Sequence, residues 1–183
     1  MAVMRLDQDR TAVLVVDVQE KLAPVMHEHE RMIAQTGRLV AGADVLGLDV
    51  LVTEQYPKGL GATVPGVADR LPDRAQRFEK TRFSGCVEPV LEHLTASAAR
   101  CVVVAGIEAH VCVAQTCLDL AVKGFDVAVA WDATASRREA DREVALHRLI
   151  QAGVMPLTVE AALFELTGEA SGQRFKAMLD VVK

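Results

Sequence analysis

Short runs of apolar residues alternate along the chain with longer stretches whose apolar residues have helical spacing. The runs predicted as strands are 12–16, 48–52, 101–105 and 125–130, with weaker ones at 77–79 and 154–158. The stretches predicted as helices are 29–46, 87–97, 112–122, 138–152 and 159–166, with a last amphipathic helix ending near Lys183. This alternation is typical of βαβ units and a mostly parallel sheet covered on both faces. We therefore predict one doubly wound, Rossmann-like α/β domain spanning residues 1–183.

Polar residues follow three of these strands. Asp17 ends the first, Lys80 ends the short run at 77–79, and Cys112 lies after the strand at 101–105, where it opens the helical stretch 112–122. Functional groups collect beyond the carboxyl ends of parallel strands, so these three residues are expected at one edge of one sheet. An acid, a cation and a thiol together are the parts of a nucleophilic hydrolase.

A cysteine at a helix N-terminus has two interpretations. The positive end of the helix dipole and the unpaired backbone amides there favour the thiolate of Cys112, and the same amides could bind an oxyanion. The alternative is a small buried apolar residue, which is the usual role of a free cysteine. The stretch 59–66 is the one long irregular segment and follows the strand at 48–52, so it is either a wall of the site or a surface loop.

Composition excludes several classes of function. The chain has 183 residues, 51% of them hydrophobic, and a net charge of −5 without a basic cluster, which argues against a nucleic-acid partner. No apolar run approaches the roughly 20 residues that span a membrane, and the N-terminus lacks the apolar core of a secretory signal. The four cysteines have no CxxC spacing, so we expect free thiols and a cytoplasmic protein.

Several segments resemble the isochorismatase-like cysteine hydrolases. They are Asp17-Val18-Gln19, Lys80-Thr81-Arg82-Phe83-Ser84 and the segment 106–113, and the segments 53–61 and 132–137 are most similar to the metal-free branch. The resemblance implies a six-stranded parallel sheet, a homo-oligomer and an Asp17–Lys80–Cys112 triad that hydrolyses small C–N amides through a thioester. It also implies a cis peptide between Ile107 and Glu108, and an oxyanion hole made by the backbone N–H groups of Glu108 and Cys112.

Further residues are predicted from position alone. Gln19, Glu54, Gln55, Tyr56 and Phe83 are expected to line the substrate pocket because they lie beyond strand ends. His110 is also expected to line the pocket, where it either assists the nucleophile or has a structural role in its turn. Metal-binding relatives use an Asp-x-His pair and a further histidine before the lysine, whereas this chain has no histidine from position 30 to 92, so we expect neither a metal nor another cofactor.

Two other functions compete with the hydrolase. A nucleotide-binding protein would need a glycine-rich phosphate loop, and the chain has neither GxGxxG nor GxxxxGK[ST]. A catalytically silent protein that binds a small molecule or a protein through the same fold is not excluded by sequence, because intact catalytic residues do not prove turnover.

Overall fold

The protein is a single six-stranded parallel sheet with helices on both faces, as predicted. A computed structural model describes residues 4–183. The strands have the order β3-β2-β1-β4-β5-β6, and every pair of neighbours is parallel. Their bounds are β1 Thr11–Val16, β2 Asp49–Gln55, β3 Gln76–Lys80, β4 Cys101–Ile107, β5 Asp126–Ala135 and β6 Met155–Leu157.

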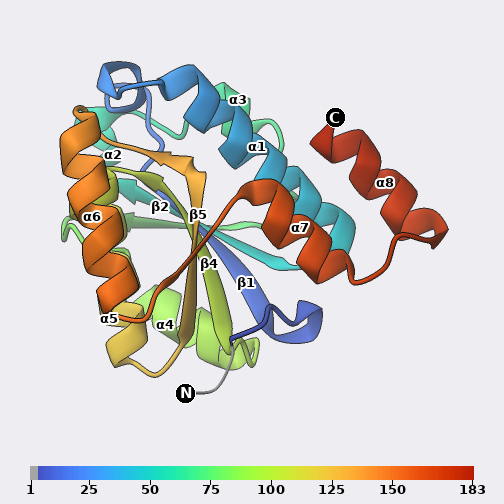
Figure 1. Cartoon of the computed structure of the whole chain (residues 1–183). Coiled ribbons are helices and arrows are strands. Elements are labelled where there is room, and N and C mark those ends of the chain that lie inside the picture. The colour runs from blue at the N-terminus through green and yellow to red at the C-terminus, as the bar shows by residue number, and fades with distance from the viewer. Residues whose placement is uncertain (1–3) are drawn as a thin grey trace.

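The helices form two layers around this sheet (Figure 1). Helices α1, α7 and α8 pack together on one face, and α4, α5 and α6 cover the other. The long helices are α1 His29–Leu46, α4 Glu88–Ala96, α5 Ala114–Val122, α6 Glu139–Gln151, α7 Val159–Thr167 and α8 Gly172–Val182. None of the helices within residues 4–183 has the length and apolar character needed to cross a membrane.

Strand β1 shows why its apolar run is continuous. Val13 and Val15 belong to the core under α1 and α7, whereas Leu14 and Val16 belong to the core under α4 and α5. Successive side chains of a strand point to opposite faces, so a strand covered on both sides needs apolar residues at every position. All six residues of β1 are buried as a result.

The strand order creates a crevice beside β1. From β1 the chain runs outward through β2 to β3, then returns to add β4 on the other side of β1 and continues to β6. The carboxyl ends of β1 and β4 therefore face the topological switch point, where open α/β sheets bind ligands. Strand β1, which ends at Asp17, has β2 and β4 as its direct neighbours, and β3, which carries Lys80, is the edge strand.

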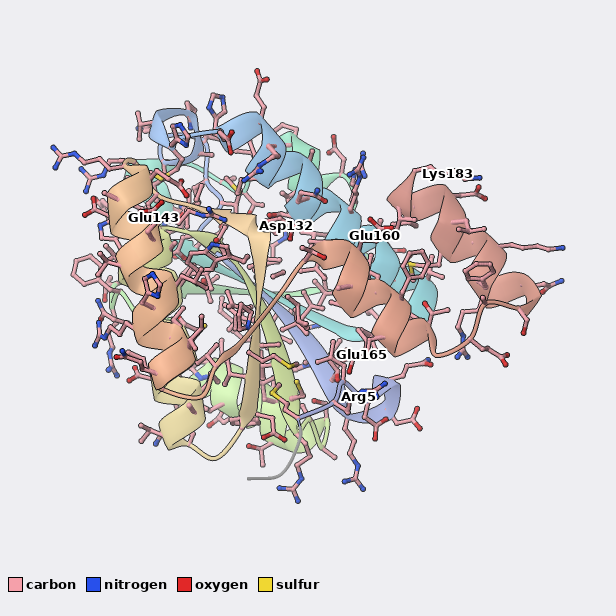
Figure 2. The ribbon with its side chains drawn as sticks, in the orientation of Figure 1. Arg5, Asp132, Glu143, Glu160, Glu165 and Lys183 are labelled. Carbon is pink, nitrogen blue, oxygen red and sulfur yellow. The ribbon has the colours of Figure 1, made fainter. Side chains whose placement is uncertain are left out.

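Strand β5 is longer than its apolar run predicted. The run ends at 130, but the strand continues to Ala135, and its pairing with β4 shifts between Val104 and Gly106. Trp131 and Asp132 lie in this irregular part, and Asp132 Oδ1 accepts a hydrogen bond of 2.8 Å from Val159 N at the start of α7. Figure 2 shows Asp132 on the β5 side of α7. Because the extra residues interrupt the apolar pattern, periodicity does not predict them.

Short helices and side-chain anchors complete the loops. The stretch 59–66, expected to be irregular, overlaps two short helices, α2 Pro57–Leu60 and α3 Pro65–Ala68, each with proline in its first turn. At the other end of the sheet, Arg5 Nε lies 2.8 Å from Glu165 Oε1 on α7, and Figure 2 shows the two side chains together. This ion pair ties the beginning of the described chain to the α7 layer.

Gly106 has a backbone position that a larger residue would not tolerate. Its φ is +118°, and an added Cβ would lie 2.1 Å from the carbonyl oxygen of Val16. We expect Gly106→Ala to lower the free energy of unfolding by at least about 3 kcal/mol, because backbone strain and the clash add together. Equilibrium unfolding in urea measures this loss.

Gly124 supplies the matched control. Its φ is also positive, at +90°, but an added Cβ there would meet no atom within 4 Å. We expect Gly124→Ala to cost only about 1 kcal/mol, the penalty of a left-handed backbone. Equal losses in the two variants would show that the close approach of β4 to β1 does not constrain position 106.

Candidate active site

Asp17 lies at the end of β1 with both carboxylate oxygens engaged. Its backbone adopts a left-handed conformation with φ of 55°, and its amide donates a 3.0 Å hydrogen bond to Thr53 O. Oδ1 accepts a 2.9 Å hydrogen bond from Thr53 Oγ1, and Oδ2 lies 2.5 Å from Lys80 Nζ. The side chains of Asp17 and Lys80 are both fully buried. A buried carboxylate of this kind needs a charged partner, and Lys80 provides it.

Lys80 reaches Asp17 from the edge strand. Two strand spacings of about 4.8 Å separate β3 from β1, and the extended lysine side chain crosses that distance over the end of β2. Its ammonium also donates to Gln55 Oε1 at 2.7 Å and to the carbonyl oxygens of Arg82 and Phe83 at 3.0 Å. These acceptors hold the charge in one place, facing Asp17.

Cys112 lies on the other side of Asp17, in the turn after β4. The turn, Ala109–Val113, is a single π-helical turn, and the α-helix begins only at Ala114. The predicted position at the start of the α-helix is therefore wrong by two residues, because a wider turn precedes the helix. Cys112 is buried, with 8% of the residue exposed, and it lies close enough to Asp17 for the carboxylate charge to raise the pKa of its thiol.

The environment of Cys112 keeps its thiol protonated. Burial raises its pKa to about 12, and the nearby Asp17 charge adds to the increase, while the Lys80 charge and the backbone amide of Glu108 act in the opposite direction. The sequence had suggested a thiolate stabilised by the helix dipole. Burial and the Asp17 charge act against that thiolate, so a reaction at this sulfur would need a base to take the thiol proton.

Asp17 is suited to be that base. Burial raises the pKa of its carboxyl above the ordinary value, against the opposing effects of the Lys80 charge and of hydrogen bonds from Lys80 and Thr53. A higher pKa brings the carboxyl closer to the thiol in proton affinity, which lowers the cost of transferring a proton between them. The arrangement can therefore generate a transient thiolate next to a protonated acid.

Backbone groups surround the thiol on the β4 side. The peptide bond between Ile107 and Glu108 is cis, and the carbonyl oxygen of Glu108 accepts hydrogen bonds from Val111 N at 3.0 Å and Val113 N at 3.1 Å. The amide of Glu108 also interacts with the Cys112 sulfur. Glu108 therefore contributes its carbonyl to the turn, and its amide lowers the pKa of the Cys112 thiol.

Thr116 joins the turn to the loop that follows Lys80. Its Oγ1 donates a 2.6 Å hydrogen bond to Cys112 O and accepts one of 2.7 Å from Gly85 N, and its side chain is buried. Thr53 and Thr116 were not among the residues predicted from sequence. Thr116 lies one helical turn after Cys112, which is the spacing at which a threonine hydroxyl reaches the backbone carbonyl, whereas the role of Thr53 depends on strand order.

Gln19 and Glu54, predicted to line the pocket, form hydrogen bonds to the backbone and side chains of neighbouring segments. The Gln19 side chain is fully buried, where its amide donates to Gln55 O and Gly61 O and its oxygen accepts from Gln55 N. Glu54 Oε1 accepts from both the amide and the hydroxyl of Thr63, at 2.8 and 2.6 Å. The pocket-lining role of both residues stays a prediction; in the structure their polar groups hold the 59–66 segment against the sheet.

The other predicted pocket residues differ in what they present. Gln55 binds Lys80 through Oε1 and Thr81 O through Nε2, so it supports the ammonium. Tyr56 and Phe83 are more than half exposed, at 56% and 57%. Tyr56 also lines an open groove of about 450 Å³ together with Lys58, Lys80 and Arg82. These exposed aromatic side chains could contact a ligand near the segment that follows Lys80.

His110 contacts the neighbouring loop through its ring. Its Nδ1 lies 3.0 Å from the hydroxyl of Ser136, which is buried. This contact favours the structural role for His110. Within residues 4–183, no group of three or more His, Cys, Asp or Glu side chains is arranged to hold a metal ion.

The fold and the site together define a class of protein. It is a doubly wound α/β protein with a buried carboxylate, ammonium and thiol at its topological switch point. The model of the isochorismatase domain matches residues 11–161. The chain belongs to the isochorismatase-domain family.

Individual relatives agree with this assignment along most of the chain. The secreted isochorismatase effector Isc1 of Phytophthora sojae is 38% identical over 183 residues, covering 98% of this chain and 87% of the effector. A solved structure described as the MAR1 ribonuclease from Caenorhabditis elegans is 38% identical, with a TM-score of 0.93 over 98% of this chain and 92% of that one. The YcaC gene product of Escherichia coli, described as an octameric hydrolase of unknown specificity, is 26% identical, with a TM-score of 0.90 over 99% of this chain and 90% of its own.

Proposed function

We propose that the protein is a cysteine hydrolase that cleaves C–N bonds of small amide-type substrates through a thioester. The observation that carries the proposal is the fully buried Lys80–Asp17 ion pair, next to a buried Cys112 whose thiol pKa responds to both charges. A neutral thiol, a carboxylate of raised pKa and a fixed ammonium are the components of an activated nucleophile. Membership of a family of hydrolases supports the reaction class.

The first half of the reaction would acylate Cys112. Asp17 takes the thiol proton as the sulfur attacks the substrate carbonyl carbon, and the carbonyl electrons move onto the oxygen. When this tetrahedral intermediate collapses, the C–N bond breaks and Asp17 returns the proton to the departing amine. Lys80 keeps Asp17 in place and balances the negative charge shared by the carboxylate and the thiolate.

The second half would hydrolyse the thioester. Asp17 removes a proton from a water molecule, which attacks the thioester carbonyl, and a second tetrahedral intermediate releases the acid and restores the thiol. In both halves the backbone amides of Glu108 and Cys112 would donate to the oxyanion. Donors fixed in advance stabilise the transition state without reorganising when the charge develops.

The proposed reaction uses no metal and no other cofactor. The thiol supplies the nucleophile, Asp17 transfers the protons and the backbone amides stabilise the oxyanion, so each step has a group in this chain. A small-molecule substrate fits a site in which the sulfur is 8% exposed.

Two rival functions need to be separated from this one. The MAR1 ribonuclease description of the C. elegans structure suggests RNA cleavage, but this chain has a net charge of −5, which disfavours binding to a polyanion. A protein that binds a ligand without turnover is the second rival. Alkylation of Cys112 by a thiol reagent would show that the thiol is accessible but would not show turnover.

The deciding experiment is a substrate screen with an ammonia-release assay. Small amides, carbamates and ureido acids are offered to the purified protein in the presence of a chelator, and single-stranded RNA is offered in parallel. We expect ammonia release from at least one small amide, undiminished by the chelator, and no RNA cleavage. Cleavage of RNA without amide turnover would replace the proposal with the ribonuclease, and loss of turnover on chelation would refute the metal-free mechanism.

We also propose that the whole chain acts as one hydrolase domain in a cytoplasmic homo-oligomer. The octameric state of the E. coli relative supports self-association. The unpaired, buried cysteines Cys86, Cys101, Cys112 and Cys117 fit a reducing compartment, although the P. sojae relative is secreted. Light scattering measures the assembly; a mass near 19.7 kDa would contradict it.

A further inference from the structure

Two side-chain bridges connect the turn that carries Cys112 to the segment after β5. Glu108 Oε2 accepts hydrogen bonds from Arg137 Nε at 2.9 Å and from Arg137 N at 3.3 Å. Two residues along the chain, His110 Nδ1 meets Ser136 Oγ at 3.0 Å. The bridges therefore join Glu108 and His110, which both precede Cys112, to the neighbouring residues Arg137 and Ser136.

These bridges begin where the pairing of the sheet ends. Ile107 pairs with Ala135 as the last register position between β4 and β5, so beyond it the backbone ladder no longer holds the two segments together. The Glu108–Arg137 ion pair and the His110–Ser136 contact continue the connection by side chains. The residue that the ion pair fixes is Glu108, whose amide lies beside the Cys112 sulfur.

We propose that Arg137 is a positioning residue that acts through the Glu108 carboxylate to hold the Glu108 amide where the reaction oxyanion forms. The inference rests on the proposed function. Arg137 lies on the surface, with 62% of its side chain exposed, whereas the Glu108 side chain is 16% exposed. A surface ion pair contributes little to stability, so the role of this contact is to orient its inner partner.

Acylation and alkylation of the Cys112 thiol depend differently on an oxyanion donor. Acylation by p-nitrophenyl acetate passes through a tetrahedral oxyanion: sulfur bonds to the carbonyl carbon, the thiol proton moves to Asp17, and p-nitrophenolate departs. Alkylation by iodoacetamide displaces iodide from a methylene carbon and forms no oxyanion. A misplaced oxyanion donor therefore slows acylation much more than alkylation, which loses only the effect of the Glu108 amide on the pKa of the thiol. A loosened or unfolded turn changes both rates to a similar extent.

The experiment compares both rates in four variants and the wild type. We expect Arg137→Gln and Glu108→Gln each to slow acylation about 10- to 100-fold, while alkylation stays within about twofold of wild type. The double variant should be no slower than either single variant, because the two residues act as one unit. Arg138→Gln is the matched control: Arg138 is exposed, its side chain has no hydrogen bond or ion pair within residues 4–183, and both rates should be unchanged.

Other outcomes overturn the inference in distinguishable ways. Wild-type acylation in Arg137→Gln, or additive losses in the double variant, would show that Arg137 does not act through Glu108. Equal losses of acylation and alkylation would show a merely structural role for the ion pair. A wild-type protein that iodoacetamide alkylates but the ester never acylates would overturn the proposed hydrolase and this inference with it.

Discussion

Replacing Lys80 with methionine should destabilise the protein by about 3–5 kcal/mol, because it leaves a buried carboxylate without its counter-charge. Methionine keeps most of the length of the lysine side chain, so the change removes the charge rather than the packing. Both side chains of the pair are fully buried, and Lys80 Nζ lies 2.5 Å from Asp17 Oδ2. Urea unfolding at neutral pH measures the loss, and turnover should disappear in the same variant.

The pH dependence identifies the cause of this loss. Burial already raises the pKa of Asp17, and without the Lys80 charge that pKa rises further. A protonated Asp17 tolerates burial, so the difference in stability between Lys80→Met and wild type should shrink as the pH falls. The double variant Asp17→Asn/Lys80→Met should regain most of the stability at neutral pH. A Lys80→Met protein as stable as wild type would show that the pair does not support the fold.

Asp17→Asn should have opposite effects on turnover and on thiol reactivity. Turnover should fall by about 10²- to 10⁴-fold, the usual loss when a positioned proton acceptor is removed. Alkylation of Cys112 by iodoacetamide at pH 8 should become faster, because the Asp17 charge raises the pKa of the thiol and asparagine carries no charge. The pH profile of alkylation should therefore move to lower pH in the variant.

Two controls make this result specific. Asp119→Asn removes a carboxylate from α5 that is not one of the three residues of the proposed triad. Both turnover and the alkylation rate of Cys112 should stay unchanged in this variant. Asp17→Asn/Cys112→Ala should lose the fast alkylation, which assigns it to Cys112 rather than to another cysteine. Slower alkylation in Asp17→Asn would mean that the carboxylate takes the thiol proton during alkylation as well, and that this assistance outweighs the effect of its charge on the pKa of the thiol.

The sequence predicted the fold well because each strand and helix carries its own pattern. The buried strands β1 and β4 carry the continuous apolar runs 12–16 and 101–105, and the predicted helix 29–46 matches α1 to the residue. The order of the strands in the sheet cannot be predicted from the pattern of any single segment. The separation of β3 from β1 by β2 explains why Lys80 must extend across a strand end to reach Asp17.

The candidate site was predictable in part. Asp17, Lys80 and Cys112 could be found because parallel strands place their carboxyl ends together. The hydrogen bonds of Gln19 to Gly61 and of Glu54 to Thr63 were not predictable, because position beyond a strand does not show which way a polar side chain points or which loop it bonds to. The high pKa of Cys112 was also missed, since it depends on burial and on the proximity of Asp17 rather than on the residue's place along a helix.

The central claim is that Cys112 forms a covalent thioester during turnover. The direct measurement is mass spectrometry of the protein quenched in acid while it turns over an amide from the substrate screen, with peptide mapping of the adduct. Cys112→Ala is the paired control, since a thiol-to-methyl change preserves most of the side-chain volume. The account predicts an acyl mass on Cys112 in the wild type and neither adduct nor turnover in Cys112→Ala; substantial turnover by Cys112→Ala would contradict it.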